Sequence, residues 1–191
     1  HYDELRNEWI KNPDIIASAT SSMLPTNITS SHIINDNPGG NKDDDLAIYE
    51  FRASHDFVQV FGIKVIAGRS FSSEHKTDTD SYVINETAAK ALGWTAEEAV
   101  GKTVIDDGNE AKTIIGVVKD FHMHSMHLSI QPLMIRLKTD WATYISVKIG
   151  RDNVPRTIAY LETTVKKFSP YPFDYQFLDD HFDQLYKSER K

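Results

Sequence analysis

The chain contains no cysteine at any of its 191 positions. Disulfide bonds, thiol nucleophiles and zinc sites built on thiolates are therefore excluded. A composition without cysteine fits a compartment in which stray thiols are a liability, although many cytosolic proteins share it. The lack of cysteine therefore restricts the chemistry that the chain can perform, but it says little about the cellular compartment of the protein.

Long apolar runs are also missing. No stretch approaches the ~20 apolar residues that a helix needs to cross a bilayer, and residues 1–10 are polar from the start, unlike a signal peptide. Hydrophobic residues make up 40% and charged residues 26% of the chain, which is typical of a globular protein. The formal net charge of -7 argues against a nucleic-acid or anionic-membrane surface, because either needs a positive field.

Two motifs of enzymes are absent from the sequence. No segment has the form G-x-x-x-x-G-K-[ST], so the phosphate-binding loop of P-loop NTPases is missing. The serines and threonines between Ser18 and Ser31 lack the G-x-S-x-G setting of a nucleophile elbow. The sequence therefore indicates neither a P-loop NTPase nor a serine hydrolase of the nucleophile-elbow type.

Hydrophobic periodicity predicts a mixture of helices and strands. Leu5 and Trp9 lie four apart, as on one helix face. The apolar run within 112–118 predicts a central strand that is buried on both faces. We predict helices at 2–11, 55–61, 85–93, 95–101, 153–168 and from 179 onward, and strands at 15–23, 46–53, 63–67, 82–84, 102–105, 112–118, 133–137, 144–149 and 173–177. This mixture indicates the α+β class.

Individual residues mark the ends of these elements. Short polar side chains accept hydrogen bonds from the first N–H groups of a helix, and glycine adopts the left-handed backbone that ends one. We predict N-caps at Asn85 and at Asp152 or Asn153, a capping box from Thr95 to Glu98, Pro155 in a first turn, and helix ends at Gly93 and Gly101. Gly116 should allow close backbone packing in the central strand.

Two polar segments are predicted to be turns. Residues 35–45 read NDNPGGNKDDD and contain no apolar residue, which predicts an exposed loop. Asp107 and Gly108 form a hairpin signal between the strands predicted at 102–105 and 112–118.

Several short motifs follow one another in a particular order. They are NPDI at 12–15, FGIKVIAGRSF at 61–71, VINE at 83–86, VGK at 100–102, IGVVKDFH at 115–122 and PL at 132–133. Each is common by itself, but their order resembles the extracytoplasmic core domain of MacB/FtsX-type ABC transporter permeases over nearly the whole chain. The polar loop at 36–45 and the charged segment at 74–80 depart from that pattern.

The resemblance implies an architecture and a function. A porter-like α/β subdomain would be formed by the two chain ends, residues 2–53 and 139–191, with a second small α/β subdomain, residues 54–138, inserted between them. The domain would couple ATP hydrolysis to conformational work and to partner or substrate interaction outside the membrane. ATP would be hydrolysed on a separate cytoplasmic ATPase module, and this domain would hold no cofactor.

The same resemblance implies a location and a set of partners. The domain would lie on the periplasmic face of a bacterial inner membrane, next to the transmembrane helices of its own permease, and would be a dimer in the full transporter. Its extracytoplasmic partners would be an adaptor, a lipoprotein or a peptide substrate. We predict partner contacts at Asp43, Asp44, Asp45 and His124, in the polar loop and in the turn after the central strand.

Two other functions remain open on the residues alone. His122 and His124 would point to one face of an extended segment, where His127 and Asp120 could complete the ligands of a metal-dependent hydrolase or a metal-binding domain. Stacking and backbone hydrogen bonding at a turn explains the same histidines without a metal. A periplasmic solute-binding module would instead need a preformed, mostly apolar pocket, which the sequence does not reveal.

Overall fold

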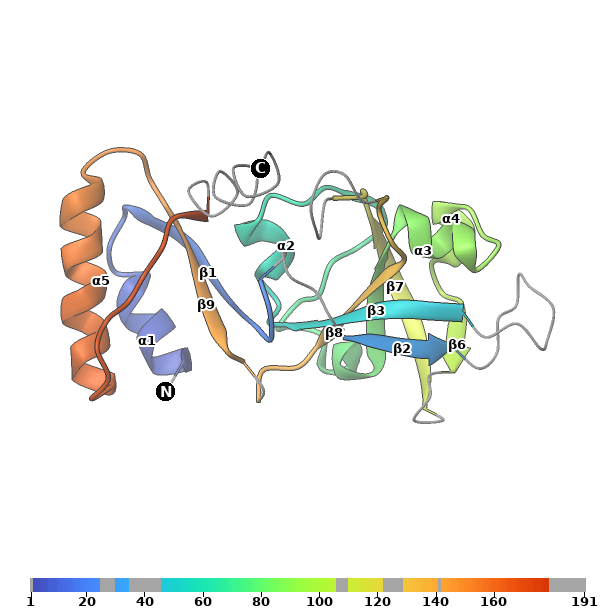
Figure 1. The fold of residues 1–191 in the computed structure, drawn as a ribbon, viewed down its shortest axis with the longest axis horizontal. Coiled ribbons are helices and arrows are strands. Elements are labelled where there is room, and N and C mark those ends of the chain that lie inside the picture. The colour runs from blue at the N-terminus through green and yellow to red at the C-terminus, as the bar shows by residue number, and fades with distance from the viewer. Residues whose placement is uncertain are drawn as a thin grey trace, which may run out of the picture. The chain divides into compact units, whose positions relative to one another are not determined.

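The structure is a computed structural model and describes residues 2–24, 30–34, 46–105, 110–121, 129–140 and 142–178. It divides into two compact units, shown with their elements in Figure 1. The terminal unit consists of residues 1–18 and 147–191, and the central unit of residues 19–146. Both unit boundaries fall within strands, β1 (Ile15–Ser21) and β9 (Tyr144–Ile149). The subdomain division expected from the family resemblance, 2–53 with 139–191 against 54–138, stays a prediction.

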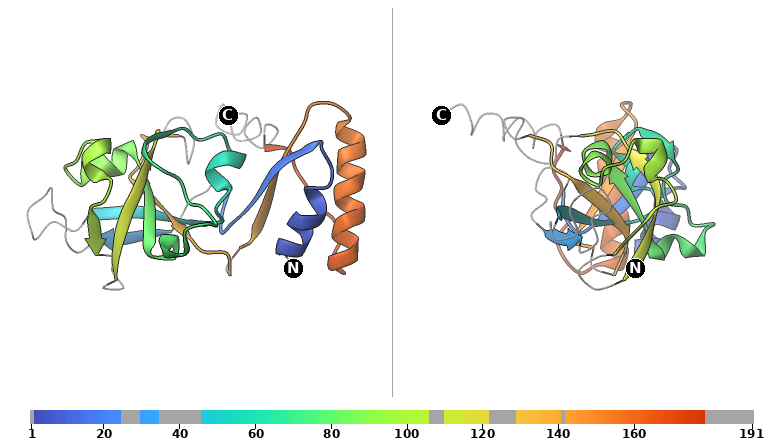
Figure 2. Two further views of the ribbon diagram at one scale, coloured as in Figure 1. Left: turned by 180° about the vertical axis from the view of Figure 1, so that it is seen from behind. Right: turned by 90° about the vertical axis from the view of Figure 1, so that its right-hand side faces the viewer.

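Two helices build the core of the terminal unit. The helices α1 (Tyr2–Trp9) and α5 (Val154–Phe168) lie side by side, as Figures 1 and 2 show. Leu5 and Trp9 are buried on the inner face of α1 and belong to one apolar cluster with Leu161 of α5. The spacing of four residues that predicted this helix therefore also selects its buried face.

A mixed sheet forms the framework of the central unit. Its strands are β2 (Ser31–Ile34), β3 (Leu46–Ala53), β4 (Val65–Gly68), β5 (Ser81–Asn85), β6 (Thr103–Ile105), β7 (Ala111–Val118) and β8 (Leu133–Leu137). The order along the sheet is β4-β7-β5-β8-β3-β1, with β2 beside β3 and β6 beside β7. The pairs β5–β7 and β3–β8 are parallel, whereas β4–β7, β5–β8 and β6–β7 are antiparallel. This arrangement confirms the α+β class.

Four short helical segments connect these strands. They are α2 (Phe57–Val60), η1 (Lys76–Asp80, a 3-10 helix), α3 (Glu86–Ala91) and α4 (Ala96–Ala99). The helices α3 and α4 follow β5 directly and supply the crossover that a parallel β5–β7 pair requires.

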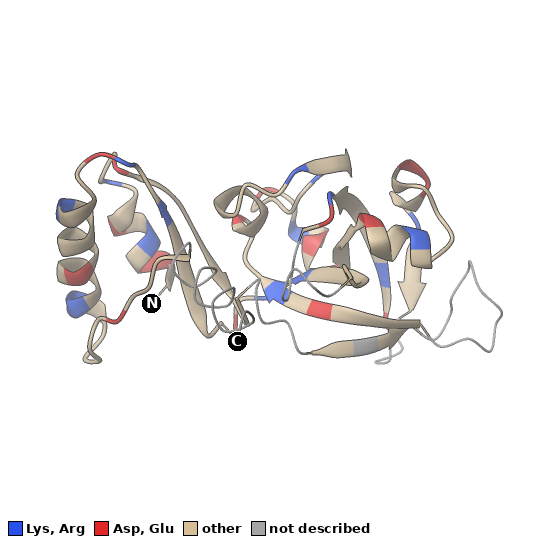
Figure 3. Cartoon of the chain, turned by 45° about the horizontal axis from the view of Figure 1, so that its top comes forward, with Lys and Arg blue, Asp and Glu red and all other residues tan. Residues whose placement is uncertain are grey.

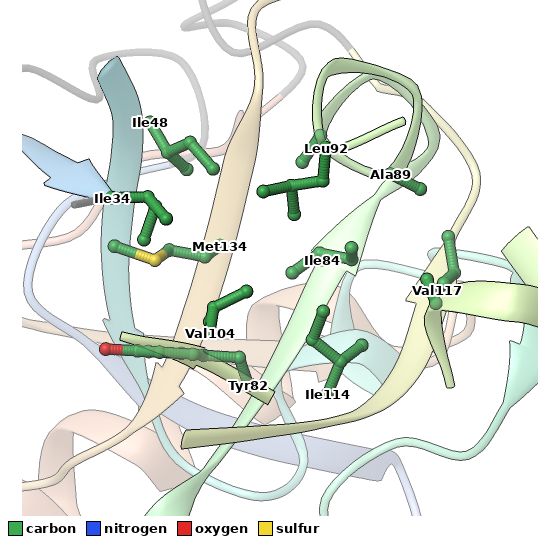
Figure 4. Packing of buried hydrophobic residues seen from close by; sticks show 12 residues of the cluster. Ile34, Ile48, Tyr82, Ile84, Ala89, Leu92, Val104, Ile114, Val117 and Met134 are labelled. Carbon is green, nitrogen blue, oxygen red and sulfur yellow. The ribbon is translucent and has the colours of Figure 1, made fainter. Parts of the chain in front are cut away.

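Apolar side chains from the strands and from the end of α3 form the core of the central unit. Figure 4 shows Tyr82, Ile84, Leu92, Ile114 and Met134 directed into one layer. Each of these five side chains is at most 1% exposed. Full burial of a side chain of this size stabilises the fold by about 1.5–3 kcal/mol, so this layer supplies a large part of the stability.

The strand β7 occupies the interior position that its apolar pattern predicted. It pairs with β5 along one edge and with β6 and then β4 along the other. Ile114, Val117 and Val118 are fully buried on it. The prediction of a central strand at 112–118 is confirmed.

Two glycines face each other where β4 meets β7. Gly68 is paired with Gly116, and a Cβ on Gly116 would lie 2.0 Å from the carbonyl oxygen of Arg69. A Cβ on Gly68 would lie 2.3 Å from the carbonyl oxygen of Ile115, and Gly68 has a φ of +64°. Only glycine fits at either position, which confirms the close packing predicted for Gly116.

An ion pair between Arg69 and Asp78 stabilises the segment that connects β4 to β5. The guanidinium of Arg69 donates two hydrogen bonds to the fully buried carboxylate of Asp78, at 2.8 and 2.7 Å. The backbone N–H of Ser72 donates a third, at 2.9 Å. The hydrogen bonds from Arg69 lower the pKa of Asp78, against the opposing effect of burial. Asp78 therefore stays ionised in the folded chain well into the acid range.

Most helix ends and strands agree with the sequence, and two expectations are wrong. Asn153 precedes α5 as predicted, but its φ is +57° and its side chain makes no capping hydrogen bond. Residues 173–177 form no strand: their alternating aromatic rings contact one another in a row, with centroids 5.5 and 5.7 Å apart. Alternation alone is not sufficient for a strand, since a strand also needs a neighbour to pair with. The strand β2 and the helix η1 were not predicted.

Replacing Gly116 with alanine should destabilise the chain by about 3 kcal/mol, because the new methyl group overlaps a backbone oxygen that cannot move away alone. Chemical denaturation of both proteins measures the difference. Gly150→Ala is the control, since its Cβ would lie 3.6 Å from the nearest atom, the carbonyl oxygen of Asp14. We expect the control to stay within about 1 kcal/mol of the parent. Equal effects of the two substitutions would contradict the close approach of β4 and β7.

The Asp78 carboxylate should make stability depend on pH in the acid range. Its pKa is lower folded than unfolded, so its contribution is complete above the unfolded pKa and is lost as pH falls through the folded one. The gap in unfolding free energy between the parent and Asp78→Asn should be constant from pH 7 to 5. It should narrow below about pH 4. Urea titrations at several pH values measure this gap. Glu74→Gln, which removes a carboxylate from an exposed site in the same segment, is the control. A constant gap for Asp78→Asn over this pH range would contradict the assignment.

Candidate functional site

The side chain of Asn85 joins three segments of the central unit. Its Oδ1 accepts hydrogen bonds from the N–H of Ala88 and the N–H of Leu133, both at 2.9 Å. Its Nδ2 donates to the carbonyl oxygen of Gln131 at 2.9 Å. The predicted N-cap is confirmed, but two of the three bonds reach a different part of the chain. Asn85 is fully buried, so these bonds replace hydration that its amide has lost.

The next two residues hold the chain where it leaves β7. The N–H of Thr87 donates to Oδ1 of Asp120 at 3.0 Å, and the hydroxyl of Thr87 donates to Oδ2 at 2.8 Å. In return, the N–H of Asp120 donates to the carboxylate of Glu86 at 3.0 Å. The first turn of α3 is thus linked to Asp120 in both directions.

These residues form one polar cluster, which we call the α3 anchor: Asn85, Glu86, Thr87, Asp120, Gln131 and Leu133. The cluster fixes the chain just before and just after residues 121–130, the segment between β7 and β8. This segment contains the residues that are predicted as a candidate metal site and as a partner contact.

The predicted site residues divide into those that the structure places and those outside its described part. Asp120 is placed, and both of its carboxylate oxygens accept hydrogen bonds from Thr87. The histidines at 122, 124 and 127 and the aspartates at 43, 44 and 45 all lie outside the described residues. The metal hypothesis therefore stays a prediction, although Asp120 has a structural role that explains its presence.

The described residues contain neither a metal-ligand cluster nor a membrane-spanning helix. Within these residues, no group of three or more His, Asp or Glu side chains is arranged to hold a metal ion. No helix among them is long and apolar enough to span a membrane.

A shallow groove of about 500 Å³ in the central unit is lined by charged residues. The ammonium of Lys112, whose side chain is 6% exposed, lies 3.1 Å from the carboxylate of Asp80 and 3.0 Å from that of Glu110. Arg136 also contacts Glu110, at 3.1 Å. Burial acts to lower the pKa of Lys112, but hydrogen bonds to Glu110 and Asp80 outweigh it and raise the pKa.

This groove is better described as an ion-pair network than as a solute pocket. Six of its ten lining residues are charged, whereas the solute-binding hypothesis requires mostly apolar walls. Acidic and basic side chains are interspersed over the described elements of both units (Figure 3). The ion pairs of Lys112 and Arg136 in the groove are one example of these interspersed charges.

The comparisons with known proteins identify the family. A family profile described as MacB-like periplasmic core domain matches residues 4–163. The chain therefore belongs to the MacB-like periplasmic core domain family, as its motifs indicated. Among curated protein sequences, none matches this chain.

Solved structures of periplasmic and extracellular transporter domains share the fold. The periplasmic region of MacB from Actinobacillus actinomycetemcomitans aligns over 97% of this chain and 82% of its own, with a TM-score of 0.67 and 20% identity. The extracellular domain of the noncanonic ABC-type transporter YknZ from Gram-positive bacteria aligns over 87% and 82%, with a TM-score of 0.59 and 16% identity. A domain of a putative permease from Porphyromonas gingivalis aligns over 89% and 83%, with a TM-score of 0.53 and 17% identity.

Sequence reasoning identified the segments of the α3 anchor but not the contacts between them. The motifs VINE, VKDFH and PL were each noted, and Asn85 was assigned its cap. The link between Thr87 and Asp120 joins positions 33 apart in the chain, and local periodicity carries no information about such a pair.

Replacing Asn85 with alanine should cost about 3 kcal/mol of stability, because it removes the helix cap and leaves buried backbone groups of Gln131 and Leu133 without partners. Thr95→Ala is the control: Thr95 also caps a helix, but it is exposed and its capping box is local. We expect the control to cost about 1 kcal/mol. Denaturant unfolding of both variants measures the two values. Equal losses would show that the bonds to Gln131 and Leu133 contribute nothing.

Proposed function

We propose that this chain is the extracytoplasmic domain of an ABC transporter permease that converts ATP-driven motion into work outside the membrane. Its membership of the MacB-like periplasmic core domain family over residues 4–163 is the observation that carries the proposal. ATP hydrolysis would take place on a separate cytoplasmic ATPase, which fits the absence of a P-loop motif from the sequence. The domain itself would perform no chemistry and hold no cofactor.

The proposal includes the position of the domain in its transporter. It would lie on the periplasmic face of a bacterial inner membrane, joined to the transmembrane helices of the same permease, which would be a dimer. The chain ends, 2–53 and 139–191, would form the porter-like subdomain and residues 54–138 the inserted one. Each of these statements follows from the family and is a proposal for this chain.

The charged groups of the described residues support a mechanical role more than a chemical one. Asp78 is satisfied by Arg69 and Ser72, Lys112 by Asp80 and Glu110, and Asp120 by Thr87. A catalytic acid or base needs a proton that can be exchanged with a substrate in a cleft. Carboxylates that hold backbone N–H groups and buried cations instead stabilise one conformation.

Partner binding is proposed at two segments. They contain Asp43, Asp44 and Asp45 in one case and His124 in the other, and the partner would be an extracytoplasmic adaptor, lipoprotein or peptide. Three neighbouring carboxylates provide a local negative field that attracts a basic partner surface.

This proposal is tested by photo-crosslinking in the full-length permease together with its ATPase, in native membranes. A photoreactive amino acid is placed at Asp44 or at His124, and at Asp152 as a control in an exposed turn. We expect adducts with an extracytoplasmic protein at both test positions, identified by mass spectrometry, and none at the control. Adducts with the permease alone, or the same adducts at Asp152, would contradict the proposed contacts.

A second measurement tests the proposed coupling. The ATPase rate of the purified permease–ATPase complex is compared between the parent and a triple variant, Asp43→Asn with Asp44→Asn and Asp45→Asn, with the crosslinked partner added. We expect the partner to change the ATPase rate of the parent but not that of the variant. The exposed carboxylates at Glu74, Glu97 and Asp152, neutralised together, supply a control with the same change of charge.

A further inference from the structure

The ion-pair network in the charged groove leaves some of the basic groups that line it unused. Four basic side chains line the groove: His55, Lys112, Arg136 and Lys138. The buried ammonium of Lys112 is held between the carboxylates of Asp80 and Glu110. The other three side chains keep hydrogen-bond donors that the described residues do not occupy.

Arg136 contributes most of these unused donors. One terminal nitrogen of its guanidinium donates to the carboxylate of Glu110 at 3.1 Å. Its remaining N–H groups have no hydrogen-bond partner among the residues that the structure describes. The N–H groups of a guanidinium form a flat fork that matches the two oxygens of a carboxylate. Arg136 can therefore hold Glu110 and a second carboxylate at the same time.

The sheet and Glu110 hold Arg136 in place before any ligand arrives. Arg136 belongs to β8, where it pairs with Arg52 of β3 on one side and with Tyr82 of β5 on the other. Its side chain is 22% exposed, and the bond to Glu110 fixes one edge of the guanidinium. A donor that is already fixed in this way loses little conformational freedom on binding.

Lys138 and His55 line the same groove as Arg136 and supply further donors. The backbone N–H of Lys138 donates to the carbonyl oxygen of Ala53 at 3.1 Å, which brings the chain after β8 next to the end of β3. The ammonium of Lys138 lies 3.8 Å from the carboxylate of Asp140, which is longer than a hydrogen bond. Within the described part of the chain, the ring of His55 makes no hydrogen bond.

The carboxylates of the groove limit the charge of a ligand. Asp80, Glu110 and Asp140 line it together with the three cations Lys112, Arg136 and Lys138, so the groove has little net charge while His55 is neutral. A dianion loses more hydration than a monoanion on entering, and a groove without net positive charge does not compensate for that loss. The unused donors therefore suit a ligand group with a single negative charge.

We propose that the charged groove binds a carboxylate group, held by Arg136 together with Lys138 and His55. The C-terminus of a peptide and a small organic acid both offer this group. The ion pairs of Lys112 would keep Asp80 and Glu110 in place while the ligand is bound. None of these residues is among the proposed partner contacts, so the site can be tested without them.

The first test measures binding to the isotope-labelled chain alone by NMR, using the backbone amide signal at position 138. N-acetyl-alanyl-alanine is added at constant ionic strength, and the same peptide with an amidated C-terminus is added in parallel. We expect a saturable shift with the free acid and no shift with the amide. Equal shifts with both peptides, or no shift with either, would overturn the assignment to a carboxylate.

Two further titrations define the ligand class. Acetate separates the two sources of the carboxylate. Acetate binding that is about threefold or more weaker than peptide binding identifies a peptide C-terminus, and equal binding identifies a small organic acid. Sulfate tests the charge, and sulfate that binds more tightly than the peptide would overturn the preference for a single negative charge.

Three variants locate the site. Arg136→Gln should weaken peptide binding about tenfold, because it removes charge-assisted hydrogen bonds. Lys138→Gln, at a more exposed position, should weaken it about threefold and decides the question if Arg136→Gln folds poorly. Arg156→Gln is the control, because Arg156 is an exposed arginine of α5 and does not line the groove. Parent affinity in every groove variant that folds, or an equal loss in the control, would overturn the proposed site.

Discussion

The amide of Asn85 is the interaction on which the central unit depends most. One buried side chain meets the needs of three segments: the start of α3, the chain at Gln131, and the first residue of β8. It can do so only when β5 and β8 are already paired, since that pairing places Asn85 next to Leu133. The polar contacts and the apolar core are therefore both satisfied by the same pairing of β5 with β8. An arrangement that satisfied only one of them would be less stable.

Local patterns predicted the elements of this fold well because their causes are local. The helix at 2–9 follows from the spacing of Leu5 and Trp9, and the capping box of Thr95 and Glu98 follows from two side chains three residues apart. The buried strand β7 was predicted from its continuous apolar run. In each case the physical interaction spans no more than a few residues of sequence.

Contacts between distant residues could not be predicted in this way. Lys112 and Asp80 are 32 positions apart, and the sequence shows only two ordinary charged residues. The strand β2 has four residues, too few for a reliable alternation, and is defined by its pairing with β3. The segment 173–177 had the alternation of a strand, but the described residues offer it no ladder partner. Pairing is a property of the whole fold, so local alternation both missed a strand and predicted a false one.

The order of the motifs carried information that no single motif did. Glu86 and Asp120 belong to different motifs, VINE and VKDFH, and neither motif by itself shows that the two residues interact. In the folded chain, the carboxylate of Glu86 accepts a hydrogen bond from the backbone N–H of Asp120. The carboxylate of Asp120 accepts two hydrogen bonds from Thr87, the residue after Glu86. Residues that act in pairs must both be present, and this is a physical reason for the two motifs to occur in one chain.

The chemistry of these residues also bears on what the domain does. An enzyme keeps a reactive group accessible and tolerates the instability that this causes. Here the buried carboxylate of Asp78 and the half-buried carboxylate of Asp120 accept two or more hydrogen bonds each from neighbours within the fold. Carboxylates bonded in this way resist motion of the backbone around them. The role proposed above, in which the domain passes a displacement to a partner, needs this resistance, because a soft connection would absorb the movement before it reached the partner.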